Sequence, residues 1–283
     1  MDFHQKHEPK SFRSCAPTYD IKALQEYLES DERKQVYLLS GPTGLGKTTT
    51  AKILSNWLAG GQRVEIIERN MANENTIDSI REVISDFRER TIIAEVRVFI
   101  LDEPQRIQPK TQDILIKALD ILPKDIYVIF CTTDPHMLKD TLRHRTHEIR
   151  FNVLSLLDQV DLVKRIIDKE QFTIGENTDT TANIISKSDA KKIVLNSEGS
   201  IRKLFDNIHT TITGGIVELP IIKEHAEKLV TAMNKGSWLT VHKAVKAIDD
   251  HEIIRQRTCY TLSAMMINTQ DDEKVRKDRK SVV

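Results

Sequence analysis

The chain has 283 residues and carries 42 Lys and Arg against 42 Asp and Glu, so its formal net charge is zero. A chain of this length buries a sizeable core and favours two or three domains over one. Balanced charge excludes an overall positive field toward nucleic acid or an acidic membrane, so any DNA contact is local or shared with other subunits. No long apolar run and no signal-peptide pattern occurs, so we expect a cytoplasmic protein that does not bind membranes.

The cysteines point to no metal or disulfide chemistry. Cys15, Cys131 and Cys259 are too scattered along the chain for a metal cluster or a disulfide framework. We expect all three to be reduced and Cys131 to lie in the core.

The first forty residues predict an arm, a helix and a strand. Residues 1–17 lack a clear hydrophobic period and their last part is bracketed by prolines, which indicates an extended arm. Residues 20–30 place four apolar side chains on one face and predict a helix. Residues 35–40 are an apolar run that predicts a buried strand.

A complete phosphate-binding loop follows this strand at residues 41–48. Its glycines let backbone N–H groups approach a polyphosphate, Lys47 reaches the β and γ oxygens, and the Thr48 hydroxyl binds magnesium. Residues 49–58 predict a helix whose N-terminus supplies N–H groups and partial positive charge beneath the phosphates. The loop residues predicted to contact the nucleotide are Gly41, Pro42, Thr43, Gly44, Leu45, Gly46, Lys47, Thr48 and Thr49.

A second informative stretch is the apolar strand predicted at residues 96–103, which ends in two acids. Residues 63–68 predict another strand before it, and residues 76–90 predict a helix. At the carboxyl end of a strand beside the phosphate loop, Asp102 can hold magnesium through water and Glu103 can orient or deprotonate the attacking water. The acid pair therefore matches a Walker B pattern.

Polar residues also end the strand predicted at residues 125–133. Thr133 can hydrogen-bond the attacking water or the γ-phosphate from this position. A helix with Pro109 near its start precedes the strand. Residues 142–151 then gather three arginines around a short helix and a last strand, for which a basic surface turn is the alternative interpretation.

The alternation of strands and helices through residue 152 predicts right-handed βαβ connections and a mainly parallel sheet with its ligand at the carboxyl edge. The pattern then changes, because residues 155–172 and 188–213 predict helices with no strands between them. Arg202 lies in the first turn of a helix, which is unfavourable for the helix dipole and suggests a partner anion; a solvated charge is the alternative. Residues 215–260 suggest a further small helical domain.

Taken in order, these stretches resemble the AAA+ ATPase subunits of DNA polymerase clamp loaders, a family that includes the bacterial tau/gamma subunit, the small subunits of replication factor C and phage counterparts. The segments that carry the resemblance are residues 6–12, 41–48, 102–105, 131–135, 144–146 and 198–202. The family implies an α/β P-loop AAA+ fold, a parallel sheet with helices on both faces, followed by a helical lid and a short C-terminal helical collar. The corresponding expected domains are residues 1–152, 153–214 and 215–283.

The resemblance also implies roles for individual residues. Thr133 aligns with the sensor 1 residue and Arg202 with the sensor 2 arginine. Arg145 aligns with the arginine finger, although Arg143 stays open for that role. The arm residues implied to contact the adenine are Pro9 and Phe12. The implied catalytic residues are Lys47, Glu103, Thr133, Arg145 and Arg202.

The function that the resemblance implies is Mg²⁺-dependent ATP hydrolysis in an oligomer. Other clamp-loader subunits would complete an assembly of typically pentameric form, which would open a sliding clamp and load it on primer–template DNA. ATP is expected rather than GTP because no guanine-recognition motif lies in the nucleotide-binding part of the chain. The candidate contacts to DNA phosphates are Arg81, Arg106 and Lys110.

Two other functions stay open. One is another AAA+ DNA-remodelling ATPase, such as a transposition regulator or a branch-migration motor. The other is a structural subunit that holds nucleotide without hydrolysing it, against which the intact set of Lys47, Asp102 and Glu103 argues. The lack of a cysteine between the two Walker motifs and the short C-terminal region favour a phage-like or archaeal-like small subunit over the bacterial one.

Overall fold

The computed structural model describes residues 2–30, 33–89, 94–175 and 183–218. The chain divides into two compact units. The first unit contains residues 1–154 together with 200–202, and the second begins at residue 155 and resumes at residue 203. The expected domain boundaries at residues 152 and 214 stay predictions.

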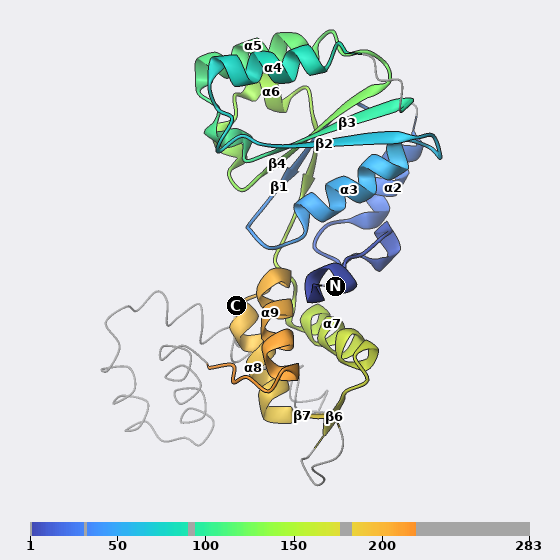
Figure 1. Ribbon diagram of the computed structural model, residues 1–283, viewed down its shortest axis with the longest axis vertical. Helices are drawn as coiled ribbons and strands as arrows, with labels where there is room; N and C mark the ends of the chain where they lie inside the picture. Colours follow the sequence, from blue (N-terminus) through green and yellow to red (C-terminus); the bar gives the residue numbers. More distant parts are fainter. Residues whose placement is uncertain (1, 31–32, 90–93, 176–182, 219–283) are drawn as a thin grey trace, which may run out of the picture. The chain divides into compact units, whose positions relative to one another are not determined.

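The first unit is built on a five-stranded sheet (Figure 1). The strands pair in the order β2-β3-β4-β1-β5, and every pair is parallel. The predicted parallel α/β sheet is therefore confirmed. Its carboxyl edge carries the end of each strand and the loop that follows it, where ligands of such sheets bind. The strands are β1 (Val36–Ser40), β2 (Val64–Asn70), β3 (Val96–Asp102), β4 (Ile126–Thr132) and β5 (His147–Arg150).

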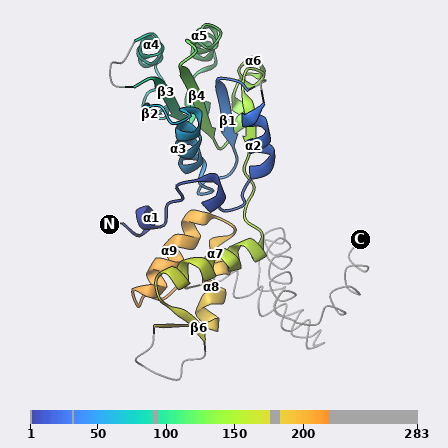
Figure 2. The same ribbon diagram turned by 90° about the vertical axis from the view of Figure 1, so that its right-hand side faces the viewer.

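Helices cover both faces of this sheet (Figures 1 and 2). Because successive strand residues point to opposite faces, Tyr37 and Leu39 pack toward one set of helices while Val36 and Leu38 pack toward the other. Both faces of β1 are apolar, as expected of a parallel strand buried on both sides. One layer contains α2 (Ile21–Glu29) and α3 (Lys47–Leu58), and the other contains α4 (Ile77–Asp86), α5 (Pro109–Leu119) and α6 (Asp140–Arg143).

The N-terminal arm is not wholly extended, and that expectation was wrong in part. It contains α1 (Phe3–Lys6) and a 3₁₀ turn, η1 (Phe12–Ser14). Ser11 and Ser14 close the turn reciprocally, since the Ser11 amide donates to Ser14 Oγ at 3.2 Å and Ser14 Oγ donates to the Ser11 carbonyl at 2.8 Å. Elements of three or four residues are fixed by such local hydrogen bonds and are too short to show a hydrophobic period.

The second unit contains two short strands that the sequence did not predict. They are β6 (Thr173–Gly175) and β7 (Ile184–Ser186), which pair in parallel between the helices α7 (Leu156–Lys169) and α8 (Lys187–Ser197). The expectation of helices without strands between them was therefore wrong. A strand of three residues spans barely one alternation of side chains, so it leaves no period in the sequence. The last described helix is α9 (Ile201–Ile212).

The predicted start of a helix near residue 186 is confirmed. Ser186 caps α8, since its Oγ accepts the Asp189 amide at 3.0 Å. Most of the predicted collar, residues 219–283, and with it Cys259, lies outside the described residues. Among the helices that the structure describes, none is long and apolar enough to cross a membrane.

Arg97 is a buried charge that ties β3 to β2 and to the end of α4. Its side chain is 10% exposed, and its Nε donates to Glu65 Oε2 at 2.8 Å. Its Nη1 donates to the carbonyls of Asp86 at 2.6 Å and Glu89 at 2.8 Å. Arg97 therefore donates to backbone carbonyls at and just after the end of α4, where the helix supplies few donors of its own.

We expect Arg97→Met to lower the free energy of unfolding by about 2–4 kcal/mol, because Glu65 and the carbonyls of Asp86 and Glu89 lose the guanidinium that donates to them. Urea unfolding followed by circular dichroism measures the change. Arg63→Met is the matched control, since Arg63 pairs with Glu95 at the surface, where the pair is 69% and 50% exposed and contributes little. An equal decrease in the free energy of unfolding in the two variants would contradict a special role for Arg97.

Candidate active site

The phosphate loop has the backbone conformation that its glycines predict. It connects β1 to α3, and Gly41, Gly44 and Gly46 have φ angles of 142°, 74° and 83°. A Cβ on Gly41 would lie 2.4 Å from the carbonyl oxygen of Phe151, so only glycine fits there. The loop ends at the N-terminus of α3, where free N–H groups and the helix dipole favour an anion.

Lys47 lies folded over this loop. Its Nζ donates to the carbonyl oxygens of Gly41 and Pro42, both at 2.8 Å. Burial lowers the pKa of the Lys47 ammonium from its ordinary value, and the positive charge of Arg202 acts in the same direction. A phosphate group is the partner that would relieve both effects, since it brings negative charge to a partly desolvated cation.

Asp102 and Thr48 meet at the end of β3. Thr48 Oγ1 lies 3.1 Å from Asp102 Oδ2 and 3.4 Å from Oδ1. Burial raises the pKa of the Asp102 carboxyl from its ordinary value, although the Thr48 hydroxyl opposes this shift. A carboxylate and a hydroxyl are oxygen ligands that suit magnesium, which is commonly held by one or two carboxylates and substrate phosphates. These residues therefore fit a magnesium ion bound with a nucleotide.

We expect Asp102→Asn to raise the melting temperature of the nucleotide-free chain. Because the pKa of Asp102 is raised on folding, the folded chain binds more protons than the unfolded chain between the two pKa values, and stability falls as the pH rises through that window. Above this window the carboxylate is ionised in both states and the whole penalty is present. Asparagine keeps the shape and an acceptor for Thr48 but carries no charge.

Thermal unfolding with and without Mg²⁺ and ATP measures this effect. The variant should also lose the additional stabilisation that Mg²⁺ gives in the presence of ATP. Asp113→Asn is the control, because Asp113 pairs with Lys139 at 2.6 Å on the surface. A lower melting temperature for Asp102→Asn without nucleotide would show that burial does not dominate the pKa of Asp102.

Glu103 follows Asp102 in an unusual backbone conformation. Its φ of 55° is left-handed, which is uncommon for a residue other than glycine, and its amide donates to the Cys131 carbonyl at 3.0 Å. Left-handed residues with side chains cluster at functional sites, where the surrounding structure holds them. The Glu103 carboxylate lies 3.6 Å from Arg106, one of the predicted DNA contacts.

The end of β4 lies against both the phosphate loop and the Walker B segment. The Gly41 amide donates to the Thr132 carbonyl at 3.2 Å. Gln105 bridges the two threonines, since Thr132 Oγ1 donates to Gln105 Oε1 at 2.7 Å and Gln105 Nε2 donates to Thr133 Oγ1 at 3.2 Å. The sequence motifs assigned no role to Gln105, although its position two residues after the acid pair indicated that it would lie near the site. Cys131, also in β4, is 2% exposed, which confirms that it lies in the core.

The arginines differ in what holds them. Arg145 makes a two-point ion pair with Asp120, with Nε to Oδ1 at 2.6 Å and Nη2 to Oδ2 at 3.0 Å. Arg143 lies 3.5 Å from Asp140 and 3.8 Å from Glu148, and its buried Nε has no hydrogen-bond partner among the described residues. The Arg145 side chain is the more exposed of the two, at 36% against 25%.

The remaining predicted residues lie in several places. The Arg202 amide donates to the Gly44 carbonyl at 3.0 Å, within the first unit. Phe12 is 5% exposed and packs in the core, and Pro9 is partly exposed. The Thr49 hydroxyl, in the first turn of α3, lies 3.4 Å from Glu8 of the arm. The Phe12 ring therefore anchors the arm, and its predicted contact with adenine stays a prediction.

The three predicted DNA contacts are surface residues. Arg81 pairs with Asp78 at 3.1 Å and Arg106 lies near Glu103, while Lys110 is exposed in the first turn of α5. The structure neither brings them together nor excludes them, so their role stays a prediction.

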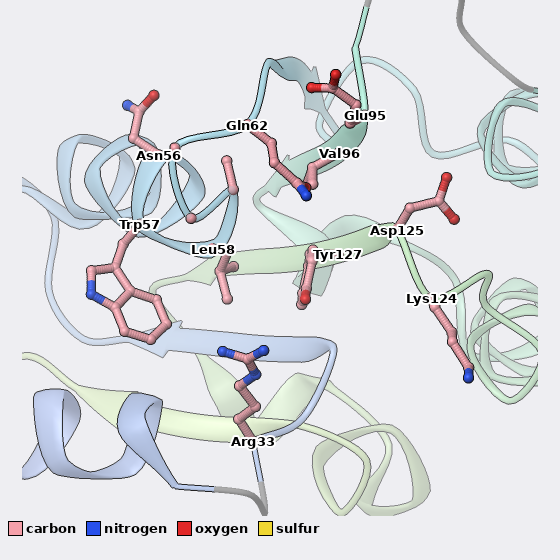
Figure 3. Close-up of a pocket in the computed structure, with 13 residues that line it drawn as sticks. Arg33, Asn56, Trp57, Leu58, Gln62, Glu95, Val96, Lys124, Asp125 and Tyr127 are labelled. Atoms are coloured by element: carbon pink, nitrogen blue, oxygen red, sulfur yellow. The ribbon is translucent and has the colours of Figure 1, made fainter.

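A cavity of about 740 Å³ lies at the opposite edge of the sheet (Figure 3). Its lining includes residues that precede β1, β3 and β4, such as Arg33, Glu95 and Asp125, and residues just after α3, such as Gly61. This cavity is therefore at the amino ends of the strands and is separate from the phosphate loop. Neither the motifs nor the resemblance predicted a site there.

The chain is similar in sequence to known DNA replication proteins. The sequence family described as DNA polymerase III, delta subunit, matches residues 62–155. The DNA polymerase III subunit gamma/tau of Mycobacterium tuberculosis is 28% identical over 203 residues, which cover 62% of this chain and 34% of the relative. The replication factor C small subunit of Methanococcus maripaludis is 27% identical over 210 residues, which cover 73% of this chain and 63% of the relative. This chain thus spans about a third of the length of the mycobacterial relative.

A solved structure of a RuvB variant from Thermotoga maritima has the same fold. It is 19% identical, with a TM-score of 0.58, and the alignment covers 82% of this chain and 80% of that one. The parallel sheet, with the phosphate loop after β1 and the acid pair at the end of β3, has the P-loop fold of the AAA+ type that this RuvB structure shows. In sequence, the chain is similar to clamp-loader subunits of DNA replication, although the family model covers only residues 62–155 and the relatives are 27–28% identical.

Proposed function

We propose that this chain is an ATP-hydrolysing clamp-loader subunit that acts in an oligomer. The observation that carries the proposal is the convergence of Lys47, Thr48, Asp102 and Glu103 at the carboxyl edge of one sheet, supported by the relatives' names. A subunit that only holds nucleotide has no need of Glu103 beside Asp102. The intact acid pair therefore favours hydrolysis.

Each residue of the site has a part in this reaction. Lys47 exchanges the carbonyls of Gly41 and Pro42 for oxygens of the β- and γ-phosphates. Thr48 and Asp102 would hold Mg²⁺, which would supply positive charge that stabilises the transferring phosphoryl group. Glu103 orients the attacking water and accepts its proton. The water oxygen bonds to the γ-phosphorus, the bond from that phosphorus to the bridging oxygen of ADP breaks, and ADP and phosphate are released.

Positive charge from two further arginines completes the site. Arg202 acts on the nucleotide of its own chain, whereas Arg145 reaches the nucleotide of the next subunit. Related P-loop enzymes lose roughly 10³–10⁵ in rate without their arginine finger. Hydrolysis therefore requires assembly, and the isolated chain is nearly inactive.

The proposed partners are the other subunits of a pentamer, a sliding clamp and primer–template DNA. ATP-bound subunits grip and open the clamp, hold DNA through its phosphates, and release both after hydrolysis, because ATP and ADP stabilise different arrangements. Arg81, Arg106 and Lys110 are the candidate phosphate contacts. The neutral chain fits such local contacts better than a general affinity for DNA.

The experiment that tests this proposal measures ATP hydrolysis by the full chain co-purified with its neighbouring subunits. We expect stimulation when a cognate clamp and primed DNA are added together. Stimulation by a four-way junction or by a transposase, and not by the clamp, would instead support another DNA-remodelling ATPase. The likeness to RuvB concerns the fold, so it does not itself favour branch migration.

A further inference from the structure

We propose that Gln105 is a positioning residue that holds the Thr133 hydroxyl as an acceptor, so that its proton is directed at the reacting end of bound ATP. This inference rests on the proposed function and assigns a role that neither the motif nor the relatives supply. It follows from the directions of four hydrogen bonds between three segments of the first unit.

The orientation of the Gln105 amide is fixed by Thr132. The Asp134 amide donates to Thr132 Oγ1 at 3.1 Å, which occupies one acceptor position of that hydroxyl. The Thr132 proton is donated to Gln105 Oε1 at 2.7 Å. Thr132 is 1% exposed, so a flipped amide would leave a buried hydroxyl proton without this acceptor. The NH₂ of Gln105 therefore points toward Thr133.

The NH₂ of Gln105 in turn sets the direction of the Thr133 hydroxyl. Gln105 Nε2 donates to Thr133 Oγ1 at 3.2 Å, so Thr133 is the acceptor in this bond. A hydroxyl has one proton and two lone pairs, and the proton stays available for another acceptor. In the part of the chain that the structure describes, the Thr133 hydroxyl donates to no protein group. Thr133 is exposed at the edge that holds the phosphate loop.

The backbone holds these segments next to the reaction site. Glu103, two residues before Gln105, donates its amide to Cys131, while Gly41 donates its amide to Thr132. The bridge by Gln105 therefore joins the segment with the general base to the residue that faces the phosphates. A preset donor aimed at developing negative charge needs no reorganisation during the reaction, and removing such a donor in other enzymes lowers the rate by about 10²–10³.

The variant that tests the inference is Gln105→Glu. It keeps the size and shape of the side chain but replaces the NH₂ donor by a carboxylate oxygen, which accepts the Thr133 proton. We expect ATP affinity to stay within about twofold of the wild type, because Lys47 and the loop are unchanged. Turnover, and affinity for ADP with aluminium fluoride as a transition-state mimic, should each fall about tenfold or more.

The matched control is Gln108→Glu. Gln108 lies just before α5, is exposed and makes no capping hydrogen bond with its side chain, so the same change of charge occurs three residues away without contact to Thr133. This control should bind and hydrolyse as the wild type does. Wild-type affinity for the aluminium fluoride complex in Gln105→Glu, or an equal loss in Gln108→Glu, would overturn the inference.

A double-mutant cycle separates positioning from a general effect on the fold. Thr133→Val removes the hydroxyl, so Gln105→Glu combined with Thr133→Val should be no slower than Thr133→Val alone. If the losses of turnover caused by Gln105→Glu and Thr133→Val add up in the double variant, the inference is overturned. If Gln105→Glu does not fold, Gln105→Met replaces it, and we expect a smaller loss of turnover than in Thr133→Val with ATP binding kept. Loss of ATP binding in Gln105→Met would overturn the inference.

The same measurements separate the two levels of the proposal. A wild-type assembly that hydrolyses ATP, together with a Gln105→Glu assembly that hydrolyses it at the same rate, overturns only the role of Gln105. A wild-type assembly that binds no ATP overturns the proposed function itself.

Discussion

Glu103→Gln is expected to leave ATP bound and unhydrolysed. The substitution keeps the size of the side chain and removes the carboxylate that accepts the proton of the attacking water. General-base catalysis contributes about 10²–10⁴ in rate, so we expect a loss of that order. Affinity for ATP should be unchanged, because Lys47, Thr48 and Asp102 are intact. An ATP-bound assembly should therefore persist, and it should keep its affinity for the clamp.

Two measurements check this result. Titration with a fluorescent ATP analogue gives the affinity, and phosphate release from the assembly gives the rate. Glu68→Gln is the control, because Glu68 lies on the neighbouring strand β2 and pairs with Lys52 at 3.0 Å on the surface. Hydrolysis at the wild-type rate by Glu103→Gln would assign the general base to another residue.

Arg145→Ala is expected to abolish hydrolysis by the assembly, with a loss of about 10³–10⁵, while each chain still binds ATP. The structure favours Arg145 over Arg143 as the finger. Arg145 pairs with one surface carboxylate, Asp120, and donates from Nη1 to the Thr141 carbonyl at 2.7 Å. The surface ion pair would exchange readily for a phosphate of the neighbour. Arg143 is more buried and lies between Asp140 and Glu148, so its removal would disturb the fold as well.

Mixing experiments show which subunit supplies the charge. Assemblies that contain both Arg145→Ala and Glu103→Gln chains should recover hydrolysis only at sites that combine an intact Glu103 with a neighbour's intact Arg145. Arg150→Ala is the matched control, since Arg150 is 73% exposed on the same segment and pairs with Glu148. Hydrolysis that falls in simple proportion to the Arg145→Ala chains, with no recovery on mixing, would place the finger elsewhere.

Long elements and the phosphate loop could be predicted because local chemistry decides them. The apolar runs before Gly41 and Asp102 are strands since both of their faces are buried, and the glycines are needed where φ is positive. The short turn at Phe12 could not be predicted because local hydrogen bonds fix it and it is too short to show a period. The strands β6 and β7 could not be predicted because three pairings between separate segments decide them. No period in the sequence reports such pairings.

The sequence alone determined the Walker motifs and the order of the longer strands and helices of the first unit. It determined them because each depends on residue type within a few positions. Only the tertiary structure decided which strands are neighbours, and therefore that Gln105 meets Thr133 and that Arg145 meets Asp120. The physical reason is that these contacts join residues some 25 or more positions apart, and the packing of the sheet and its helices brings them together.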